Sequence, residues 1–287
     1  MFKYFANLFG YLLNGIYGVV NNYGIAIIIF TLIVKGLMLP ISIKQQKTMK
    51  KTAKIQKESK EIQEKYKNDQ VRQSQELMEL YKRENMSPFS GCLSSIFQIV
   101  LVLSVFYLVS SPLTYMKKVD SKLINTYREE IQQQRGETVN YPEIAIIKEK
   151  GKVDEKVNLN MDFFGLDLSD IPSQNYEDWT VYVIPVLYVM TSLISMRLTK
   201  NMTKMNNENA IKEKGIEENK EENQNDSAEM MDEMNKQMNL MMPIMTVSIA
   251  LIAPLGLALY WLVSNLLMIF ERVVLNRFLI EGEEVDG

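Results

Sequence analysis

The chain has 287 residues with 32 basic and 35 acidic side chains, so its net charge points to no class of charged partner. It contains no histidine and one cysteine, Cys92, which excludes Ser-His-Asp triads, histidine or cysteine-cluster metal sites and intrachain disulfides. Strongly apolar blocks alternate with strongly polar ones, and this segregation indicates a polytopic membrane protein. We expect no enzymatic activity, no cofactor and no DNA partner.

Residues 1–22 carry apolar side chains at helical spacing and predict an amphipathic helix that lies on the membrane surface. A first transmembrane helix is expected over 24–43, since about 20 apolar residues cross a bilayer core. Lys35 lies inside this stretch, and a charge at that depth costs roughly 2.5–3.5 kcal/mol on insertion scales. Two interpretations are open: its ammonium group reaches toward the interface, or it lies in a polar functional cavity.

Residues 44–86 predict a cytoplasmic, basic helical hairpin with twelve basic and seven acidic residues and a polar break at Asn68-Asp69. Its expected apolar stripes comprise Met49, Ile55, Ile62, Tyr66, Val71, Leu77, Met78, Leu80 and Tyr81. The hairpin is either a solvated spacer near anionic lipid heads or a platform for a cytosolic partner or an incoming chain. Its basic start places the N-terminus outside.

A second transmembrane helix is expected over 91–110, followed by an extracellular loop over 111–178. In this loop Glu143–Lys148 and Lys156–Met161 predict short strands. The third span is expected over 179–198, between the interface aromatic Trp179 and basic residues at its inner end. A cytoplasmic loop over 199–236 follows, and the polar composition of its core, 206–227, predicts disorder.

The run Gln237–Phe270 is uncharged for 34 residues, and as one helix it would be about 51 Å long. Ala253–Gly256 breaks the pattern, so we expect two short transmembrane helices over 237–253 and 257–270 and a cytoplasmic tail over 271–287. Such short helices favour a locally thin bilayer. The methionines between Met230 and Met245 indicate either ordinary helix packing or an adaptable surface for apolar segments.

Six stretches, in their order along the chain, resemble the YidC family of membrane protein insertases: Tyr23–Gln45, Glu64–Asp69, Glu76–Lys82, Ser87–Gln98, Asp162–Ser169 and Met242–Asn265. The resemblance implies an all-α membrane protein with five transmembrane helices around a hydrophilic groove that is open to the cytoplasm and lipid. It implies insertion and folding of newly made membrane proteins, alone or with the Sec translocon, without a nucleotide. The family's groove carries a basic residue in the first span, usually arginine, and Lys35 occupies that position.

The chain departs from the family pattern at several positions. Lys35 in place of arginine keeps the charge and loses the forked donor geometry. Ser87-Pro88 stands where Asn-Pro is usual, and Ser94-Ser95 where Leu-Pro is common. There is no large outer domain, and the acidic end EGEEVDG makes tail-mediated ribosome docking unexpected. We therefore expect a compact member in the plasma membrane of a bacterium with a single membrane, with the C-terminus in the cytoplasm.

The expected mechanism is electrostatic: Lys35 transiently attracts the acidic tail of an incoming chain, whose apolar segment then enters the lipid. The expected partners are nascent membrane proteins and the lipid bilayer, with the Sec translocon and the ribosome as further candidates. Each further groove candidate has an alternative as an interhelical hydrogen bond or interface aromatic: Thr31, Gln98, Thr191, Ser195, Tyr260, Trp261, Ser264 and Asn265. A small transporter or channel with Lys35 as an anion site, and a scaffold that shields client helices, remain alternative functions.

Overall fold

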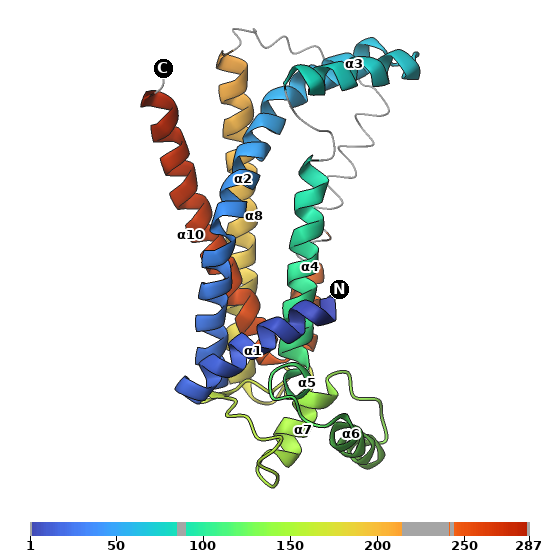
Figure 1. Ribbon diagram of the computed structural model, residues 1–287, viewed down its shortest axis with the longest axis vertical. Coiled ribbons are helices and arrows are strands. Elements are labelled where there is room, and N and C mark those ends of the chain that lie inside the picture. Colours follow the sequence, from blue (N-terminus) through green and yellow to red (C-terminus); the bar gives the residue numbers. More distant parts are fainter. Residues whose placement is uncertain (1, 85–89, 214–240, 242–243, 286–287) are drawn as a thin grey trace. The chain divides into compact units, whose positions relative to one another are not determined.

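The structure, a computed structural model, describes residues 2–84, 90–213, 241 and 244–285. Most of these residues are helical (Figure 1). The elements in chain order are α1 (Phe2–Val20), α2 (Tyr23–Lys65), α3 (Gln70–Arg83), α4 (Ser90–Ser110), α5 (Pro112–Tyr115), α6 (Ser121–Arg135), α7 (Pro142–Lys150), β1 (Asp162–Phe163), β2 (Leu166–Asp167), the 3₁₀ helix η1 (Trp179–Tyr182), α8 (Val183–Glu213) and α10 (Leu255–Val285). Residues 244–252 are helical as well.

Among the described residues, three helices are long and apolar enough to cross a membrane: Tyr23–Thr48, Trp179–Thr199 and Leu255–Leu275. A helix satisfies its own backbone hydrogen bonds, which hydrocarbon requires of a spanning segment. The mostly helical class is therefore confirmed, with three helices that are candidates for crossing the membrane. The described part of α4 adds a shorter apolar stretch, Gln98–Ser110.

The chain divides into two compact units. The first unit comprises Met1–Leu37, Val100–Ser195 and Met230–Gly287, and the second comprises Met38–Ile99 and Met196–Glu229. The first unit holds the start of α2, the end of α4, the start of α8 and all of α10. It also holds α1 and the segment between α4 and α8, residues 111–178, which we call the cap.

Tyr23 joins three parts of the first unit where α2 begins. Its fully buried hydroxyl donates a hydrogen bond to the Val109 carbonyl of α4 at 3.4 Å, and its backbone N–H donates to the Asn160 carbonyl of the cap at 3.0 Å. Its ring also faces α10, because a Cβ atom on Gly256 would lie 3.6 Å from it. The Gly256 N–H donates to the Leu168 carbonyl at 2.9 Å. The start of α2, the end of α4 and the start of α10 are therefore held together at one segment of the cap.

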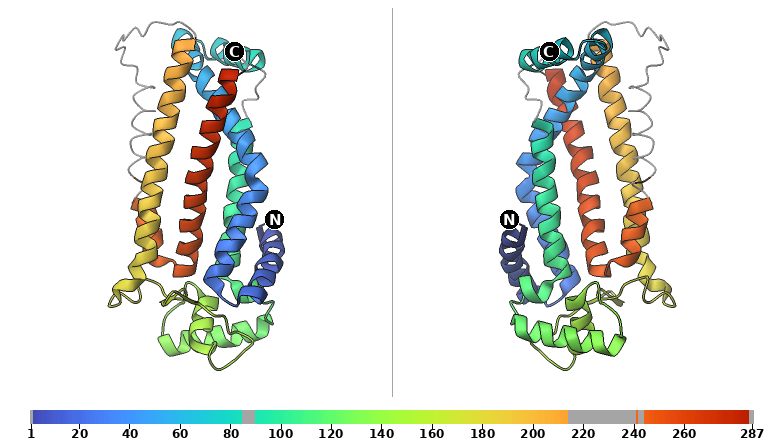
Figure 2. Two further views of the ribbon diagram at one scale, coloured as in Figure 1. Left: turned by 90° about the vertical axis from the view of Figure 1, so that its left-hand side faces the viewer. Right: turned by 90° about the vertical axis from the view of Figure 1, so that its right-hand side faces the viewer.

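In the cap, α6 packs on α7, and α5 packs on both α7 and α1. Figures 1 and 2 show these helices clustered at the end of the first unit where α2, α8 and α10 begin. Glu143 of α7 ties α5 down: its carboxylate accepts hydrogen bonds from the Thr114 backbone N–H at 2.9 Å and hydroxyl at 2.5 Å. Lys118 ties the cap to α1, since its ammonium group donates to Asn7 at 2.5 Å and lies 4.6 Å from the Tyr11 ring centroid.

The strand prediction for Glu143–Lys148 is wrong, because these residues lie in the helix α7. Pro142 occupies the first turn of α7, where its fixed φ favours a helix, and Lys148 and Lys150 lie in the last turn, where cations complement the helix dipole. The apolar run 144–147 is buried throughout, and such a short run does not distinguish a strand from a buried helix.

The strand prediction for Lys156–Met161 is also wrong, because the first strand, β1, begins only after this range, at Asp162. β1 and β2 form an antiparallel hairpin, with Phe163 paired to Leu166. Phe164 and Gly165 make its two-residue turn with φ of 53° and 82°, the positive values that a type I′ turn requires. A Cβ atom on Gly24 would lie 2.3 Å from the Phe163 ring, so the absent side chain at Gly24 makes room for this hairpin against α2.

In the second unit, α3 folds back along the end of α2. The turn between them ends at Asp69, whose side chain caps the first turn of α3. The Gln73 side chain donates to the Gln63 carbonyl at 2.9 Å, and Arg83 pairs with Glu58. These contacts link positions 10 and 25 residues apart and define a helical hairpin.

The apolar stripe of this hairpin is narrower than expected. Ile55 and Leu80 are buried, whereas Val71 and Met78 are exposed. The prediction that all nine stripe residues face the helix contact is therefore wrong for Val71 and Met78. Two helices that pack along a narrow seam bury few side chains, and the many charged residues on the other faces stay in water.

Three boundaries differ from those expected. α2 passes Pro40 and residue 44 without a break, and α8 continues to Glu213, so residues 206–213 are helical and not disordered. Residues 214–227 lie outside the described part of the chain, as does most of the Met230–Met245 stripe. α10 continues beyond Phe270 to Val285, so the expectation that the last span is only marginally long enough for a bilayer is wrong.

Gly10→Ala is predicted to weaken the contact between α1 and α5. An added Cβ atom would lie 1.8 Å from the Tyr115 carbonyl oxygen, so one helix must move away. Overpacking of this kind costs about 1–3 kcal/mol. Gly15→Ala is the matched control, because an added Cβ meets nothing within 4 Å and alanine favours the helix. Thermal unfolding in detergent should rank Gly10→Ala below wild type and Gly15→Ala at or above it; equal stability of the two variants would contradict the packing.

Glu143 is predicted to make the α5–α7 contact depend on pH. Burial raises the pKa of Glu143 above its ordinary value, although the hydrogen bonds from Thr114 oppose this rise. The folded cap therefore binds the proton more tightly than the unfolded cap does, so stability is greatest below the ordinary carboxyl pKa and falls as pH rises through the raised value.

Hydrogen exchange of residues 112–116, corrected for the intrinsic pH dependence of exchange, measures this effect. Protection should fall as pH rises above the ordinary glutamate pKa, and Glu143→Gln should flatten the dependence because glutamine does not titrate. If protection in the wild type instead rises with pH over this range, the result contradicts a raised pKa of Glu143.

Candidate functional site

Lys35 lies half-buried in the membrane-spanning part of α2, twelve residues after Tyr23. Thr31 lies one turn before it on the same side of the helix, is 2% exposed, and donates its hydroxyl to the Ile27 carbonyl at 2.6 Å. The Thr31 hydroxyl is therefore bonded within its own helix, and not to another helix as its alternative interpretation had it. Gly36, next to Lys35, borders open space, since an added Cβ would meet nothing within 4 Å.

Two charged side chains, Glu271 and Arg272, lie half-buried in the membrane-spanning part of α10. The sequence predicts a tail from residue 271 onward, because Glu271 is the first charge after the uncharged run. A 21-residue span that begins at Leu255 nevertheless includes positions 271 and 272.

The polar candidates on α8 and α10 lie in the first unit, and α10 lies between α2 and α8 there (Figure 2). The rings of Tyr188 and Trp261 contact each other across these helices, with centroids 5.5 Å apart. Thr191 donates its hydroxyl to the Tyr188 carbonyl at 2.9 Å, and Ser195, one turn further along, is buried with a partner. Trp261 thus joins α10 to the polar face of α8.

On the same helix, α10, Tyr260 is buried, and Ser264 and Asn265 are half-buried. The Ser264 oxygen is buried near the Tyr260 hydroxyl, and it has no hydrogen bond of normal geometry within the described residues. An unsatisfied buried hydroxyl costs free energy in a protein interior, so this atom is a place where a polar group of another molecule or a water would be stabilised. Gln98 belongs to the second unit and is exposed, and its groove role stays a prediction.

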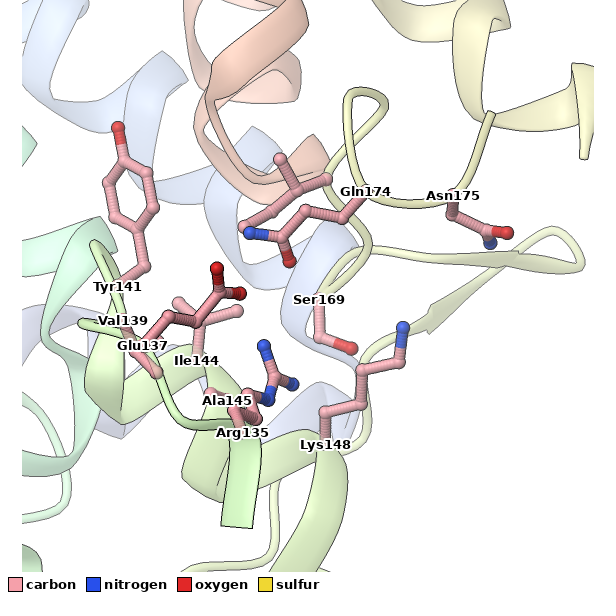
Figure 3. A pocket seen from close by; sticks show the side chains of 11 residues that line it. Arg135, Glu137, Val139, Tyr141, Ile144, Ala145, Lys148, Ser169, Gln174 and Asn175 are labelled. Atoms are coloured by element: carbon pink, nitrogen blue, oxygen red, sulfur yellow. The ribbon is translucent and has the colours of Figure 1, made fainter. Parts of the chain in front are cut away.

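A cavity of about 630 Å³ lies in the cap (Figure 3). Its lining side chains come from the end of α6, from the 137–141 segment that follows it, from α7 and from the 169–175 loop. Its two cations already have partners, because Arg135 pairs with Glu149 at 2.5 Å and Lys148 pairs with Asp170. These ion pairs tie α6 to α7 and α7 to the loop, so we assign them to the stability of the cap. In the part of the chain that the structure describes, no three metal-ligating side chains converge.

Comparison with known proteins places this arrangement in a family. The family model described as "60Kd inner membrane protein" matches residues 15–282. Proteins named "Membrane protein insertase YidC" are similar over shorter stretches. The one from Syntrophus aciditrophicus is 46% identical over 94 residues, and the one from Wigglesworthia glossinidia brevipalpis is 41% identical over 99 residues. The one from Francisella tularensis subsp. novicida is 35% identical over 109 residues.

These three matches cover 33%, 34% and 38% of this chain, and 17%, 18% and 20% of the respective relatives. The family model covers far more, since it includes α2, the cap, α8 and the spanning part of α10. The resemblance found in the sequence is thereby confirmed: the chain belongs to the 60Kd inner membrane protein family, in which its relatives named YidC are bacterial membrane protein insertases.

Proposed function

We propose that this protein inserts newly made membrane proteins into the bacterial membrane and helps them fold, and that Lys35 is the cation of its substrate groove. The observation that carries the proposal is a half-buried lysine in an apolar helix of a chain that belongs to this family. An intramembrane charge is expensive and is by default a functional group. The protein acts here without bond chemistry, as an insertase and chaperone and not as an enzyme.

Lys35 lowers the cost of moving a polar tail partway through the bilayer. The carboxylates of an acidic tail are stabilised by the ammonium group, which offsets part of the hydration that they lose. The apolar segment behind the tail then enters the lipid, and burial of its surface drives the insertion forward. The attraction has to be weak enough for release, so a single half-buried lysine suits the task better than a tight, fully enclosed pair.

The proposed groove is bounded by five spans, with 91–110 and 237–253 completing the three helices described above. The basic hairpin that follows α2 supports a cytoplasmic location for the hairpin and an N-terminus outside, by the positive-inside rule. The cap then lies outside and closes the groove on that side, and the C-terminus lies in the cytoplasm. Exposed apolar side chains of α1, such as Tyr4, Leu8 and Tyr11, would rest on the outer membrane surface.

The proposed partners are nascent membrane proteins and the bilayer, with the Sec translocon and the ribosome as further partners. The basic hairpin of α2 and α3 is the surface that fits a cytosolic partner, since it has twelve basic and seven acidic residues over 44–86. The substrate groove would use Lys35 together with Thr31, Gln98, Thr191, Ser195, Tyr260, Trp261, Ser264 and Asn265.

Lys35→Ala is predicted to reduce the insertion of a single-span client with an acidic N-terminal tail by several-fold, because no cation then meets the tail. Lys35→Arg should retain most of the activity, since the charge remains. A client with an uncharged tail serves as the control and should be inserted at similar rates by all three proteins. Protease protection of the translocated tail in proteoliposomes measures insertion.

Full activity of Lys35→Ala on the acidic-tail client would overturn the role of the charge. The same proteoliposomes distinguish the alternative functions. A transporter or channel would release a trapped anion such as chloride, and a scaffold would bind the client without protecting its tail. We expect no anion release above that of empty liposomes, and protection of the tail.

A further inference from the structure

We propose that Phe164, at the tip of the β1–β2 hairpin, anchors the cap to the membrane: its ring inserts among the lipid headgroups of the leaflet next to the cap. The partner of this side chain is thus the lipid surface itself. The inference goes beyond the proposed function, because it needs only the candidate spans and holds whichever side of the membrane the cap faces.

Phe164 is a residue that its own turn does not favour. It is the first central residue of the type I′ turn and has a φ of 53°, where asparagine, aspartate or glycine is usual. A bulky side chain at positive φ is an outlier. The next cross-strand pair is unfavourable as well, since Asp162 and Asp167 place like charges opposite each other. Local preference therefore does not explain a phenylalanine at this position.

Phe164 is also left uncovered by the described part of the chain. Its side chain is 87% exposed, although its ring meets that of Phe163 edge to face, with the centroids 4.8 Å apart. One exposed apolar side chain needs no explanation by itself. An exposed phenylalanine at positive φ does, because strained residues persist where a function or the surroundings over-determine them. The contact that accounts for Phe164 therefore lies outside the chain.

β1 is fixed to the start of α2, the first candidate span. Gly24 is the second residue of this span, and the Phe163 ring takes the space beside it. The Asp162 carbonyl accepts a hydrogen bond at 2.6 Å from the side chain of Asn22, the residue before the span. Since the rings of Phe163 and Phe164 are in contact, Phe164 lies within about 10 Å, one helix diameter, of the first turn of α2.

The end of the hairpin is fixed to the start of another candidate span. The Leu168 carbonyl, one residue after β2, accepts a hydrogen bond at 2.9 Å from the N–H of Gly256, the second residue of the span in α10. The third candidate span begins at Trp179, an interface aromatic that is 74% exposed. The hairpin therefore stands where spans begin, at the boundary between hydrocarbon and headgroups.

Lipid is the occupant that fits a single ring at this boundary. Apolar side chains of surface-bound segments enter the boundary between headgroups and acyl chains to a depth of about 5–10 Å, which is within the reach of Phe164. A stable protein partner would need a patch of about 800 Å² on each side, far more than one ring supplies. The anchor would hold the hairpin, and with it the first turns of α2 and α10, at the membrane interface.

Phe164→Trp tests the contact with a fluorescent ring that keeps the aromatic character. The full-length protein is reconstituted in liposomes whose lipids carry bromine either near the top or deep in the acyl chains. The emission of the wild type, which comes from Trp179 and Trp261, is subtracted. The added emission should be quenched several-fold more by the shallow bromines than by the deep ones, and it should be shielded from iodide in the water.

Val153→Trp is the matched control. Val153 is also 87% exposed, and it lies in the loop after α7, at the end of the cap away from α2 and α10 (Figure 1). Its added emission should be quenched by iodide and not by brominated lipid. Unfolding temperatures in detergent check that both variants fold.

The anchor is overturned if iodide quenches Phe164→Trp as readily as Val153→Trp and brominated lipid has no effect. Shielding that develops only with an added client, or only at high protein density in the membrane, assigns the ring to a client or a second copy and also overturns it. If Phe164→Trp does not fold, a nitroxide on Phe164→Cys in a Cys92→Ser background measures the same contact. Oxygen, which dissolves in lipid, should then reach the nitroxide more readily than a water-soluble nickel complex; the reverse order overturns the inference.

Discussion

An ammonium group inside an apolar helix has to reach water or meet an opposite charge, and the structure around α2 is arranged under that constraint. Lys35 is the one charged residue between Lys3 and Lys44. It is half-buried, and the next residue, Gly36, borders open space.

The cap fixes the start of the helix that holds Lys35. Tyr23 starts α2 against α4, α10 and the cap, and Leu168 holds the start of α10. The depth of Lys35 follows from the start of α2, because the helix then advances by a constant rise. A polar loop of this length folds because it has a core of its own, with Ile131, Ile146 and Val157 buried and Glu143 satisfied by hydrogen bonds.

The sequence predicts the parts of this protein that composition controls. Long apolar runs identify the spans, the break at Asn68-Asp69 separates α2 from α3, and ordered motifs identify the family. It fails where two physical effects compete. The run 144–147 suits a buried strand and a buried helix equally, and only the flanking Pro142 and lysines favour the helix. The end of α10 fails for a different reason: a helix stabilised by its own hydrogen bonds continues past the first charged residue, so the sequence assigns Glu271 to the tail although α10 includes it.

The central claim is that the sign of the charge at position 35 selects the client's tail. A charge swap tests it most directly: insertion of two matched single-span clients, one with an acidic tail and one with a basic tail, by wild type and by Lys35→Glu in proteoliposomes. The account predicts that wild type favours the acidic tail and that Lys35→Glu, folded as judged by its unfolding temperature, reverses the preference. The same order of preference for both proteins would contradict it.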